Sequence, residues 1–366
     1  MGDRLAFLLG KDPAAVHGGD MTMFRTMQAI AAERYATEVI CLSDSSTAEG
    51  SVERIAKPPV TPARLAGRSL VGRRGLVHTR FDIEGMRRAI ERSSADRFVA
   101  VHSYMAEPYL HAAGTRPDNL LISTEVSEAA VWRRTRGAAG RWEAGRIARD
   151  ELRIARTARA IAGYDRDEVE DYRRRGIARA HWLPLTLPPA PKVDIASTPP
   201  RLVALGTRTW GPNAQAADTI VKWWPEIGAG IPGAELWLVG ARTGGGGAEL
   251  PAGVTDRGFV DDLDGTLASC RALVAPITVG GGVRVKLLEA ASRGLPVVGT
   301  PEAIGSIESS LGMTAAADRE EFIGRCRAYL LDAAAAAEDG AALHTANARR
   351  WTDRIGQDAV HEWLSA

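Results

Sequence analysis

The chain has little cysteine. Three cysteines, Cys41, Cys270 and Cys326, stand far apart among 366 residues and form no CxxC pair. This spacing favours free thiols in a reducing compartment rather than a disulfide framework. The sequence also has no HExxH motif and no cluster of Cys and His, so we predict that it uses no metal ion and no other cofactor.

Long apolar runs and an excess of charge of one sign are also absent. No run of about 18 apolar residues occurs, so we predict no membrane span. The apolar stretch from Leu5 to Gly10 is too short for a signal peptide and has no basic leader. A net charge of +1 excludes bulk electrostatic binding of nucleic acid. We therefore expect a cytoplasmic protein, with peripheral contact with the inner face of the membrane as an open alternative.

Two familiar nucleotide motifs are missing as well. No GxGxxG follows the first predicted strand, which argues against a nicotinamide enzyme. The glycine-rich segment from Gly240 to Gly247 lacks the GxxxxGK[ST] pattern, so we interpret it as a flexible loop.

Short apolar segments alternate with segments of helical spacing along the whole chain. Arg4–Leu9, Glu38–Leu42 and Arg201–Leu205 are typical of buried parallel strands, and Met21–Ala32 has the spacing of an amphipathic helix. With 366 residues, 45% of them hydrophobic and 25% charged, the chain is an ordinary globular protein long enough for two domains. This alternation predicts an α/β fold with two doubly wound, Rossmann-like domains that face a central cleft.

Proline marks the expected boundary between the domains. The segment Pro184–Pro200 contains six prolines and no helical or strand pattern, so we predict a linker and hinge there. We expect one domain over residues 1–190 and a second over 191–345. A helix over 346–366 is expected to pack back on the first domain.

Two basic segments stand outside this pattern. Residues Pro58–Leu76 are rich in Arg, Gly and Pro, and we interpret them as an irregular, solvated excursion. The stretch Arg133–Arg159 is interpreted as a solvated helix, with contact to anionic lipid or a phosphorylated acceptor as the alternative.

The most informative segment is Gly280-Gly281-Gly282-Val283-Arg284-Val285-Lys286, which precedes Glu289. Glycines allow backbone N–H groups to approach an anion, and the helix start behind them carries a partial positive charge. Arg284 and Lys286 add full charges, and Lys286 shares a helix face with Glu289 three residues later. The pattern predicts a nucleoside-diphosphate site with a carboxylate for the ribose hydroxyls. The alternative for Glu289 is a purely structural role, as an ion pair with Lys286.

Several ordered motifs resemble the carboxyl-terminal domain of retaining GT-B glycosyltransferases of the family 4, or group 1, type. Gly206–Asn213 resembles the turn and helix start after the first strand of that domain, and Asp256–Asp262 resembles the loop that frames the nucleotide base. The glycine turn resembles the family's donor-phosphate and ribose element. Pro232–Gly240 matches the strand between these motifs, and the match covers roughly residues 200–335.

The amino-terminal half resembles the family more weakly. His17-Gly18-Gly19 is similar to the glycine loop after the first strand, and His102 is similar to a histidine that lines the acceptor side of the cleft in some relatives. A packing role for His102 and a surface-loop role for Glu125 stay open as alternatives. Gly281 departs from the pattern, because many relatives have a glutamate there; the Gly-rich branch of the family shares the replacement.

The resemblance implies transfer of a sugar from a nucleoside-diphosphate donor to an acceptor hydroxyl with retention of configuration. The partners expected are that nucleotide sugar and an acceptor that the sequence does not identify: a polysaccharide, a lipid-linked sugar or a small natural product. Alternatives are a GT-B sugar-nucleotide epimerase and a catalytically silent binding protein. The catalytic candidates are His102, Arg284 and Lys286. The donor-binding candidates are Gly18, Gly19, Gly206, Thr207, Arg208, Asn213, Gly258, Phe259, Val260, Gly280, Gly281, Gly282, Val283 and Glu289.

Overall fold

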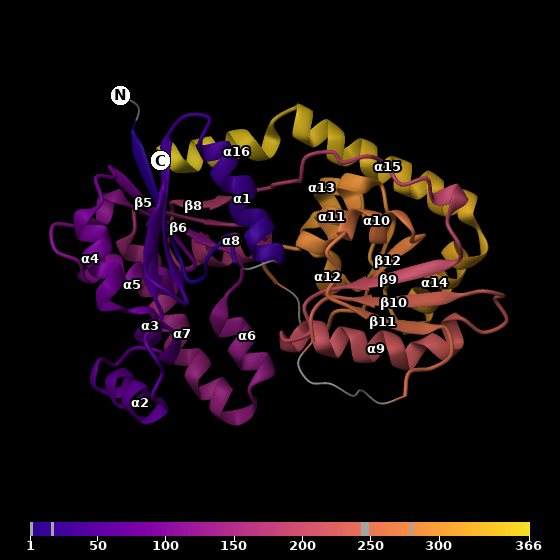
Figure 1. Cartoon of the computed structure of the whole chain (residues 1–366), viewed down its shortest axis with the longest axis horizontal. Coiled ribbons are helices and arrows are strands. Elements are labelled where there is room, and N and C mark those ends of the chain that lie inside the picture. The colour runs from indigo at the N-terminus through magenta and orange to yellow at the C-terminus, as the bar shows by residue number, and fades with distance from the viewer. Residues whose placement is uncertain (1–2, 16–17, 243–248, 279–280) are drawn as a thin grey trace. The chain divides into compact units, whose positions relative to one another are not determined.

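A computed structural model describes residues 3–15, 18–242, 249–278 and 281–366. The chain divides into two compact units (Figure 1). Unit 1 contains residues 1–184 and 357–366, and unit 2 contains residues 185–356. The chain therefore passes between units after Pro184 and after Gly356, compared with the boundaries at 190 and 345 expected from the sequence.

Unit 1 contains an eight-stranded sheet with the order β3-β4-β2-β1-β5-β6-β7-β8. All neighbouring strands are parallel except β3 and β4. Parallel strands need crossover connections, which is why helices separate most of them along the chain. The strands are β1 (Arg4–Leu9), β2 (Ala36–Ser43), β3 (Thr47–Glu49), β4 (Val52–Ala56), β5 (Arg97–Val101), β6 (Leu120–Thr124), β7 (Ala160–Gly163) and β8 (Ala180–Trp182).

Helices pack against both faces of this sheet. On one face the ring of Phe24 packs edge-on against Phe7, and Trp363 is fully buried. On the other face Met86 and Ile154 join one apolar cluster with residues of the sheet. The helices are α1 (Gly19–Ala31), α2 (Pro62–Val71), α3 (Leu76–Phe81), α4 (Glu84–Arg92), α5 (Ala106–His111), α6 (Glu128–Thr135), α7 (Gly137–Thr157), α8 (Arg166–Arg174) and α16 (Ile355–Ser365), with the 3₁₀ turns η1 (Ser103–Met105) and η2 (Pro117–Asn119).

Unit 2 contains a five-stranded parallel sheet with the order β11-β10-β9-β12-β13. Ile220 and Trp224 of one helix and Phe322 of another share an apolar cluster with the strands. The strands are β9 (Arg201–Leu205), β10 (Glu235–Val239), β11 (Val254–Gly258), β12 (Ala272–Ala275) and β13 (Val297–Gly299). The helices are α9 (Gly211–Ile227), α10 (Leu263–Ala268), α11 (Val285–Arg293), α12 (Pro301–Ile304), α13 (Ile307–Leu311), α14 (Arg319–Leu331) and α15 (Ala333–Thr352), with the 3₁₀ turn η3 (Ile195–Ser197).

The structure adds detail to two segments that were expected to be irregular. Residues Pro58–Leu76 contain helix α2, which begins at Pro62. Proline fits the first helical turn because its missing N–H has no intrahelical partner there. The proline-rich segment is not a free linker, because Ala190 N donates to the Ser292 carbonyl and Val193 N donates to the Arg293 carbonyl, both at 2.9 Å.

Other observations concern the absences predicted from sequence. Cys41, Cys270 and Cys326 are free and buried. Among the described residues, no helix is long and apolar enough to cross a membrane. Within the same residues, no group of three or more His, Cys, Asp or Glu side chains is arranged to hold a metal ion. Of the Gly240–Gly247 segment, residues 243–248 lie outside the described residues, as do His17 and Gly280.

Candidate functional site

Two glycine turns meet at the carboxyl ends of β9 and β10 in unit 2. Gly206 follows β9 with φ 154°, and a Cβ there would lie 2.7 Å from Cγ of Asn213. Gly240 follows β10 with φ 132°, and its Cβ would lie 2.2 Å from the Gly206 carbonyl oxygen. Because neither position has room for a side chain, the backbone is brought unusually close to the start of α9. Ligands of parallel α/β sheets bind at this edge.

Lys286 projects from the first turn of α11 toward the same place. Its Nζ donates a hydrogen bond to Oδ1 of Asn213 at 2.8 Å, and Asn213 Nδ2 donates to the Thr207 carbonyl at 3.1 Å. Burial lowers the pKa of Lys286 to about 8. These bonds join α11, α9 and the turn after β9, so three of the predicted donor-binding elements meet around one ammonium group.

The glycine turn before α11 has the backbone that the sequence predicted. Gly281 and Gly282 have φ values of 141° and 69°, which side chains rarely allow. Val283 follows them and is partly buried. Arg284 precedes the helix, and its Nη1 donates to the Gly282 carbonyl at 2.9 Å. The first turn of α11 leaves backbone N–H groups without intrahelical acceptors, next to two cationic side chains.

Glu289 lies on α11 with its side chain 13% exposed. It forms an ion pair with Arg293, which also pairs with Asp264 of α10. Lys286, the alternative partner considered from sequence, is bonded to Asn213 instead. These ion pairs fix the orientation of the Glu289 side chain.

Arg208 is held by a carboxylate that sequence reasoning did not single out. Its guanidinium binds Asp256 through two bonds of 2.9 and 2.6 Å and donates to the Gly240 carbonyl at 2.8 Å. The hydrogen bond from Arg208 lowers the pKa of Asp256. Asp256 also accepts a bond from Gly258 N at 2.9 Å, which shapes the turn before Phe259. Arg208, one of the donor-binding candidates, anchors the end of β11 through this pair.

The remaining predicted loop residues follow that turn. Gly258 has φ 60°, Phe259 is 56% exposed and Val260 is partly buried. A large exposed aromatic ring after a positive-φ glycine is compatible with the expected base-framing loop. The Arg208–Asp256 pair could not be predicted from the sequence, because two opposite charges 48 residues apart give no indication that they are close in space.

In unit 1, His102 follows β5 in a strained conformation. Its φ of 72° and ψ of 148° are rare for a residue with a side chain. Nε2 lies 3.5 Å from Oε2 of Glu125, which is only 5% exposed and follows β6. Burial by itself would lower the pKa of His102, but the hydrogen bond and charge of Glu125, helped by Glu128 and Asp20, raise it. The structure thus brings together the two unit 1 side chains that the sequence considered separately.

Neighbouring groups fix the His102 ring. It stacks on Tyr104 with centroids 5.0 Å apart and an interplanar angle of 10°, and Tyr104 stacks on Phe81 at 4.4 Å. Nδ1 of His102 is buried with no hydrogen-bond partner among the described residues. Tyr104 was not foreseen, because an aromatic residue three positions after a strand end is usually a core residue.

Gly18 and Gly19 lie at the start of α1, as the N-cap and the first helical residue. A Cβ on Gly18, whose φ is 156°, would lie 2.9 Å from an oxygen of Asp20. Asp20 pairs with Lys11 at 2.6 Å. In unit 2 the structure joins Lys286, Asn213 and the turn after β9, and in unit 1 it joins His102 to Glu125.

Comparisons with known proteins concern the family and the fold. Residues 199–332 match the family model described as "Glycosyl transferases group 1". A comparison with the sequences of characterised proteins found no relative. Among solved structures, the chain is similar to sucrose-phosphate synthase from Thermosynechococcus elongatus, with 17% identity, a TM-score of 0.74 and full coverage of both chains.

Two further structures show the same likeness. WaaG, a glycosyltransferase involved in lipopolysaccharide biosynthesis, is 15% identical with a TM-score of 0.70, over 99% of this chain and 100% of WaaG. Anabaena Alr3699/HepE in complex with UDP and glucose is 13% identical with a TM-score of 0.67, over all of both chains. The chain has the two-domain α/β fold of GT-B glycosyltransferases, and its residues 199–332 match the group 1 family of these enzymes.

Proposed function

We propose that this protein transfers a sugar from a nucleoside-diphosphate donor to an acceptor hydroxyl with retention of anomeric configuration. The observation that carries the proposal is Lys286, a partly buried ammonium bonded to Asn213 beside the glycine turn and the start of α11. This arrangement lies inside the segment that matches the group 1 family. The likeness to a protein solved with UDP and glucose supports a nucleotide-sugar donor.

In the proposed reaction the bond between the anomeric carbon and the diphosphate oxygen breaks, and negative charge grows on the departing diphosphate. Preorganised positive groups aimed at that charge are the largest catalytic contribution we expect. Lys286, Arg284 and the N–H groups of the glycine turn supply them, so the proposal requires no metal ion. The departing phosphate accepts the proton of the acceptor hydroxyl.

Glu289 is assigned to the ribose hydroxyls. Its carboxylate is fixed by Arg293 and lies one helical turn after Lys286 on the same helix. Gly281 occupies the position where many relatives have a glutamate near the sugar. We propose that backbone N–H groups of Gly281 and Gly282 take over that contact, which leaves the sugar unassigned.

His102 is assigned to orienting the reacting groups. The pair with Glu125 keeps the ring protonated to a higher pH than an ordinary histidine, because the buried carboxylate favours the charged form. Its strained backbone supports a functional role, since such conformations persist mainly where the surrounding structure enforces them.

A donor screen tests the proposal. Thermal unfolding is measured with UDP-, GDP-, ADP- and dTDP-sugars, because a ligand that binds the folded protein raises its stability. The selected donor is then incubated with candidate acceptors, and the anomeric configuration of the product is determined by NMR. Transfer that falls by two orders of magnitude in Lys286→Ala but not in Lys222→Ala, an exposed lysine of α9, supports the site.

Other outcomes identify the alternatives. An epimerised nucleotide sugar formed from the donor alone indicates an epimerase. Tight binding in calorimetry without turnover on any acceptor indicates a binding protein, which the replacement at Gly281 favours. Equal turnover of wild type and Lys286→Ala overturns the site assignment.

A further inference from the structure

One end of unit 1 exposes large apolar side chains. Leu70 and Val71, at the end of α2, are 62% and 89% exposed, and Trp142 of α7 is 63% exposed. Val60, which precedes α2, is 46% exposed. Exposed aliphatic residues are common singly, but a tryptophan and a Leu-Val pair on adjoining helices form a contiguous feature that calls for a partner. We name these residues, with the arginines around them, the α2–α7 surface.

The α2–α7 surface is strongly basic although the chain as a whole has a net charge of only +1. Residues 57–81 contain six Lys or Arg residues and no Asp or Glu. Residues 129–142, which cover most of α6 and the start of α7, contain four arginines and again no acidic residue. The exposed arginines of the two segments are Arg64, Arg68, Arg73, Arg80, Arg133, Arg134, Arg136 and Arg141.

Hydrogen bonds hold α2 against α7, so the apolar residues belong to one surface. Arg146 of α7 donates to the Ser69 carbonyl at 2.9 Å, next to Leu70, and also to the Arg74 carbonyl. The same guanidinium lies 5.0 Å from the centre of the Trp142 ring. Arg149 donates to the Arg73 carbonyl. One arginine side chain thus joins Trp142 to the end of α2, and Figure 1 shows α2 and the α6–α7 turn at the same end of the unit.

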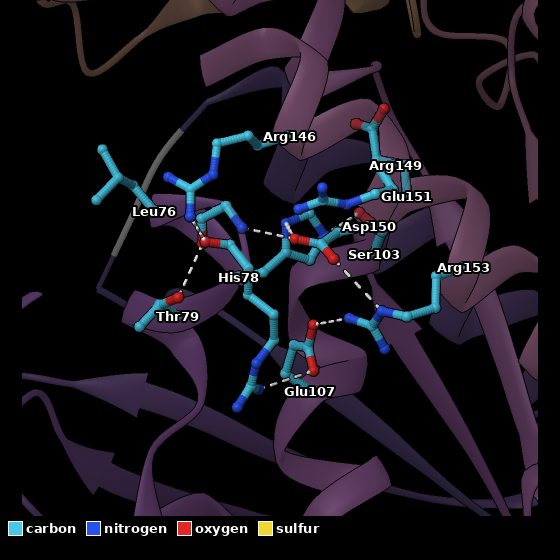
Figure 2. Close-up of polar contacts among 12 residues, drawn as sticks. Leu76, His78, Thr79, Ser103, Glu107, Arg146, Arg149, Asp150, Glu151 and Arg153 are labelled. Atoms are coloured by element: carbon cyan, nitrogen blue, oxygen red, sulfur yellow. Dashed lines mark hydrogen bonds and ion pairs between the residues drawn. The ribbon is translucent and has the colours of Figure 1, made fainter. Parts of the chain in front are cut away.

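A buried polar network supports this surface from below. Glu107, which is fully buried, binds Arg153 of α7 and also Arg74, the latter at 3.2 Å. Asp150 accepts a bond from Gly75 N at 2.6 Å, and His78 bonds with Ser103 at 3.2 Å (Figure 2). Because these contacts fix α3 and the chain after α2 to α7, the exposed apolar groups are presented by a rigid frame.

We propose that the α2–α7 surface docks on an anionic lipid bilayer. Tryptophan and short aliphatic side chains enter the boundary between headgroups and acyl chains, while arginines bind anionic headgroups. Charge complementarity selects this partner, because eight exposed arginines, in two segments that contain no acidic residue, would repel another basic surface and attract an anionic one. The inference concerns a partner and does not depend on the proposed reaction.

Vesicle binding tests the proposal. The purified full chain is sedimented with vesicles of phosphatidylcholine alone and with vesicles containing 30% phosphatidylglycerol, roughly a cytoplasmic-leaflet charge density. We expect binding only to the anionic vesicles, and a marked loss in 0.5 M NaCl, roughly where the Debye length falls to a few ångströms. The double variant Arg133→Glu/Arg141→Glu should bind at least about 25-fold more weakly, at roughly fivefold for each arginine.

Apolar contacts are tested separately. Leu70→Ser should weaken binding to anionic vesicles about tenfold, since it removes an inserted leucine. Leu331→Ser is the matched control, because Leu331 of unit 2 is 64% exposed, and it should bind like wild type. Arg349→Glu, on α15 with its side chain 81% exposed, is the control for charge. Unchanged thermal unfolding shows that each variant is folded.

Three results overturn the proposal. The first is no binding to the anionic vesicles at low salt. The second is equal binding by wild type, Leu70→Ser and Arg133→Glu/Arg141→Glu. The third is salt-sensitive binding to soluble dextran sulfate that matches vesicle binding and is unaffected by Leu70→Ser, which assigns the surface to a soluble polyanion instead of a bilayer.

Discussion

Raising the pH from 7 to 9 should weaken the binding of a nucleoside diphosphate because it removes the charge of Lys286. The ammonium is withdrawn from water and bonded to Asn213, and burial lowers its pKa to about 8 from an ordinary 10.5. A lysine exposed to solvent would keep its charge throughout this range. The titration therefore distinguishes Lys286 from every exposed lysine of the chain.

The magnitude follows from the fraction of protein that carries the charge. With a pKa of about 8, about 90% of Lys286 is protonated at pH 7 and about 10% at pH 9. If the diphosphate binds the protonated form, the apparent Kd rises as the inverse of that fraction. Affinity should then fall about tenfold, which is ~1.4 kcal/mol.

Calorimetric titration with UDP, or with the nucleoside diphosphate that the donor screen selects, measures the effect from pH 7 to 9. Lys286→Arg is the matched control, because an arginine stays charged across this range. A change in the protonation of the ligand itself would alter the affinity of the wild type and of Lys286→Arg equally. The wild type should lose about ten times more affinity than Lys286→Arg.

Stability gives an independent check. In the folded state the charged form of Lys286 is disfavoured. Lys286 therefore lowers the free energy of unfolding fully below pH 8, and this destabilisation disappears as the pH rises from 8 toward 10.5. Lys286→Met should therefore stabilise the protein at pH 7, by up to about 3 kcal/mol, while it abolishes transfer. Equal loss of affinity in wild type and Lys286→Arg, or a Lys286→Met protein that is less stable at pH 7, refutes the reasoning.

Three further predictions concern carboxylates. Glu289→Ala should reduce donor affinity about 10- to 100-fold in calorimetry, because the ribose hydroxyls lose a charged acceptor, while binding unchanged from wild type would remove Glu289 from the site. Glu125→Gln should lower the pKa of His102 in an NMR titration, because the opposite charge 3.5 Å away is lost; an unchanged pKa would show that Glu125 does not act on His102. Glu107→Ala should destabilise unit 1 by about 3–5 kcal/mol in urea unfolding, because it removes the buried carboxylate that both Arg74 and Arg153 bind, whereas Glu170→Ala, which breaks an exposed pair, should cost under about 1 kcal/mol. Similar costs for the two would show that the buried network is dispensable.

Periodicity predicted the regular part of the fold well. The strands expected at Arg4–Leu9 and Arg201–Leu205 have the bounds of β1 and β9, and the parallel order follows from their alternation with helices. Short strands such as β3 and β8, three residues each, were missed because they carry no detectable alternation. Helix α2 was missed because its prolines and glycine suggested an irregular segment, although Pro62 stands where a helix tolerates it.

Of the site, the sequence predicted the glycines best. Gly206, Gly281 and Gly282 have positive φ values, as a turn that approaches an anion requires. The pairing of charges was predicted worst. The pair between Arg208 and Asp256 was not anticipated, and the partner considered for Glu289 was Lys286 rather than Arg293.

The sequence by itself determined the parallel α/β architecture of two domains and the positions of the turns, because these depend on local periodicity and on the φ freedom of glycine. Only the tertiary structure decided which charges are neutralised by the protein and which stay available to a ligand. It joined Arg208 to Asp256, His102 to Glu125 and Lys286 to Asn213, residues that lie 48, 23 and 73 positions apart. Such pairs depend on distances through space between elements, and these distances are set by packing rather than by spacing along the chain.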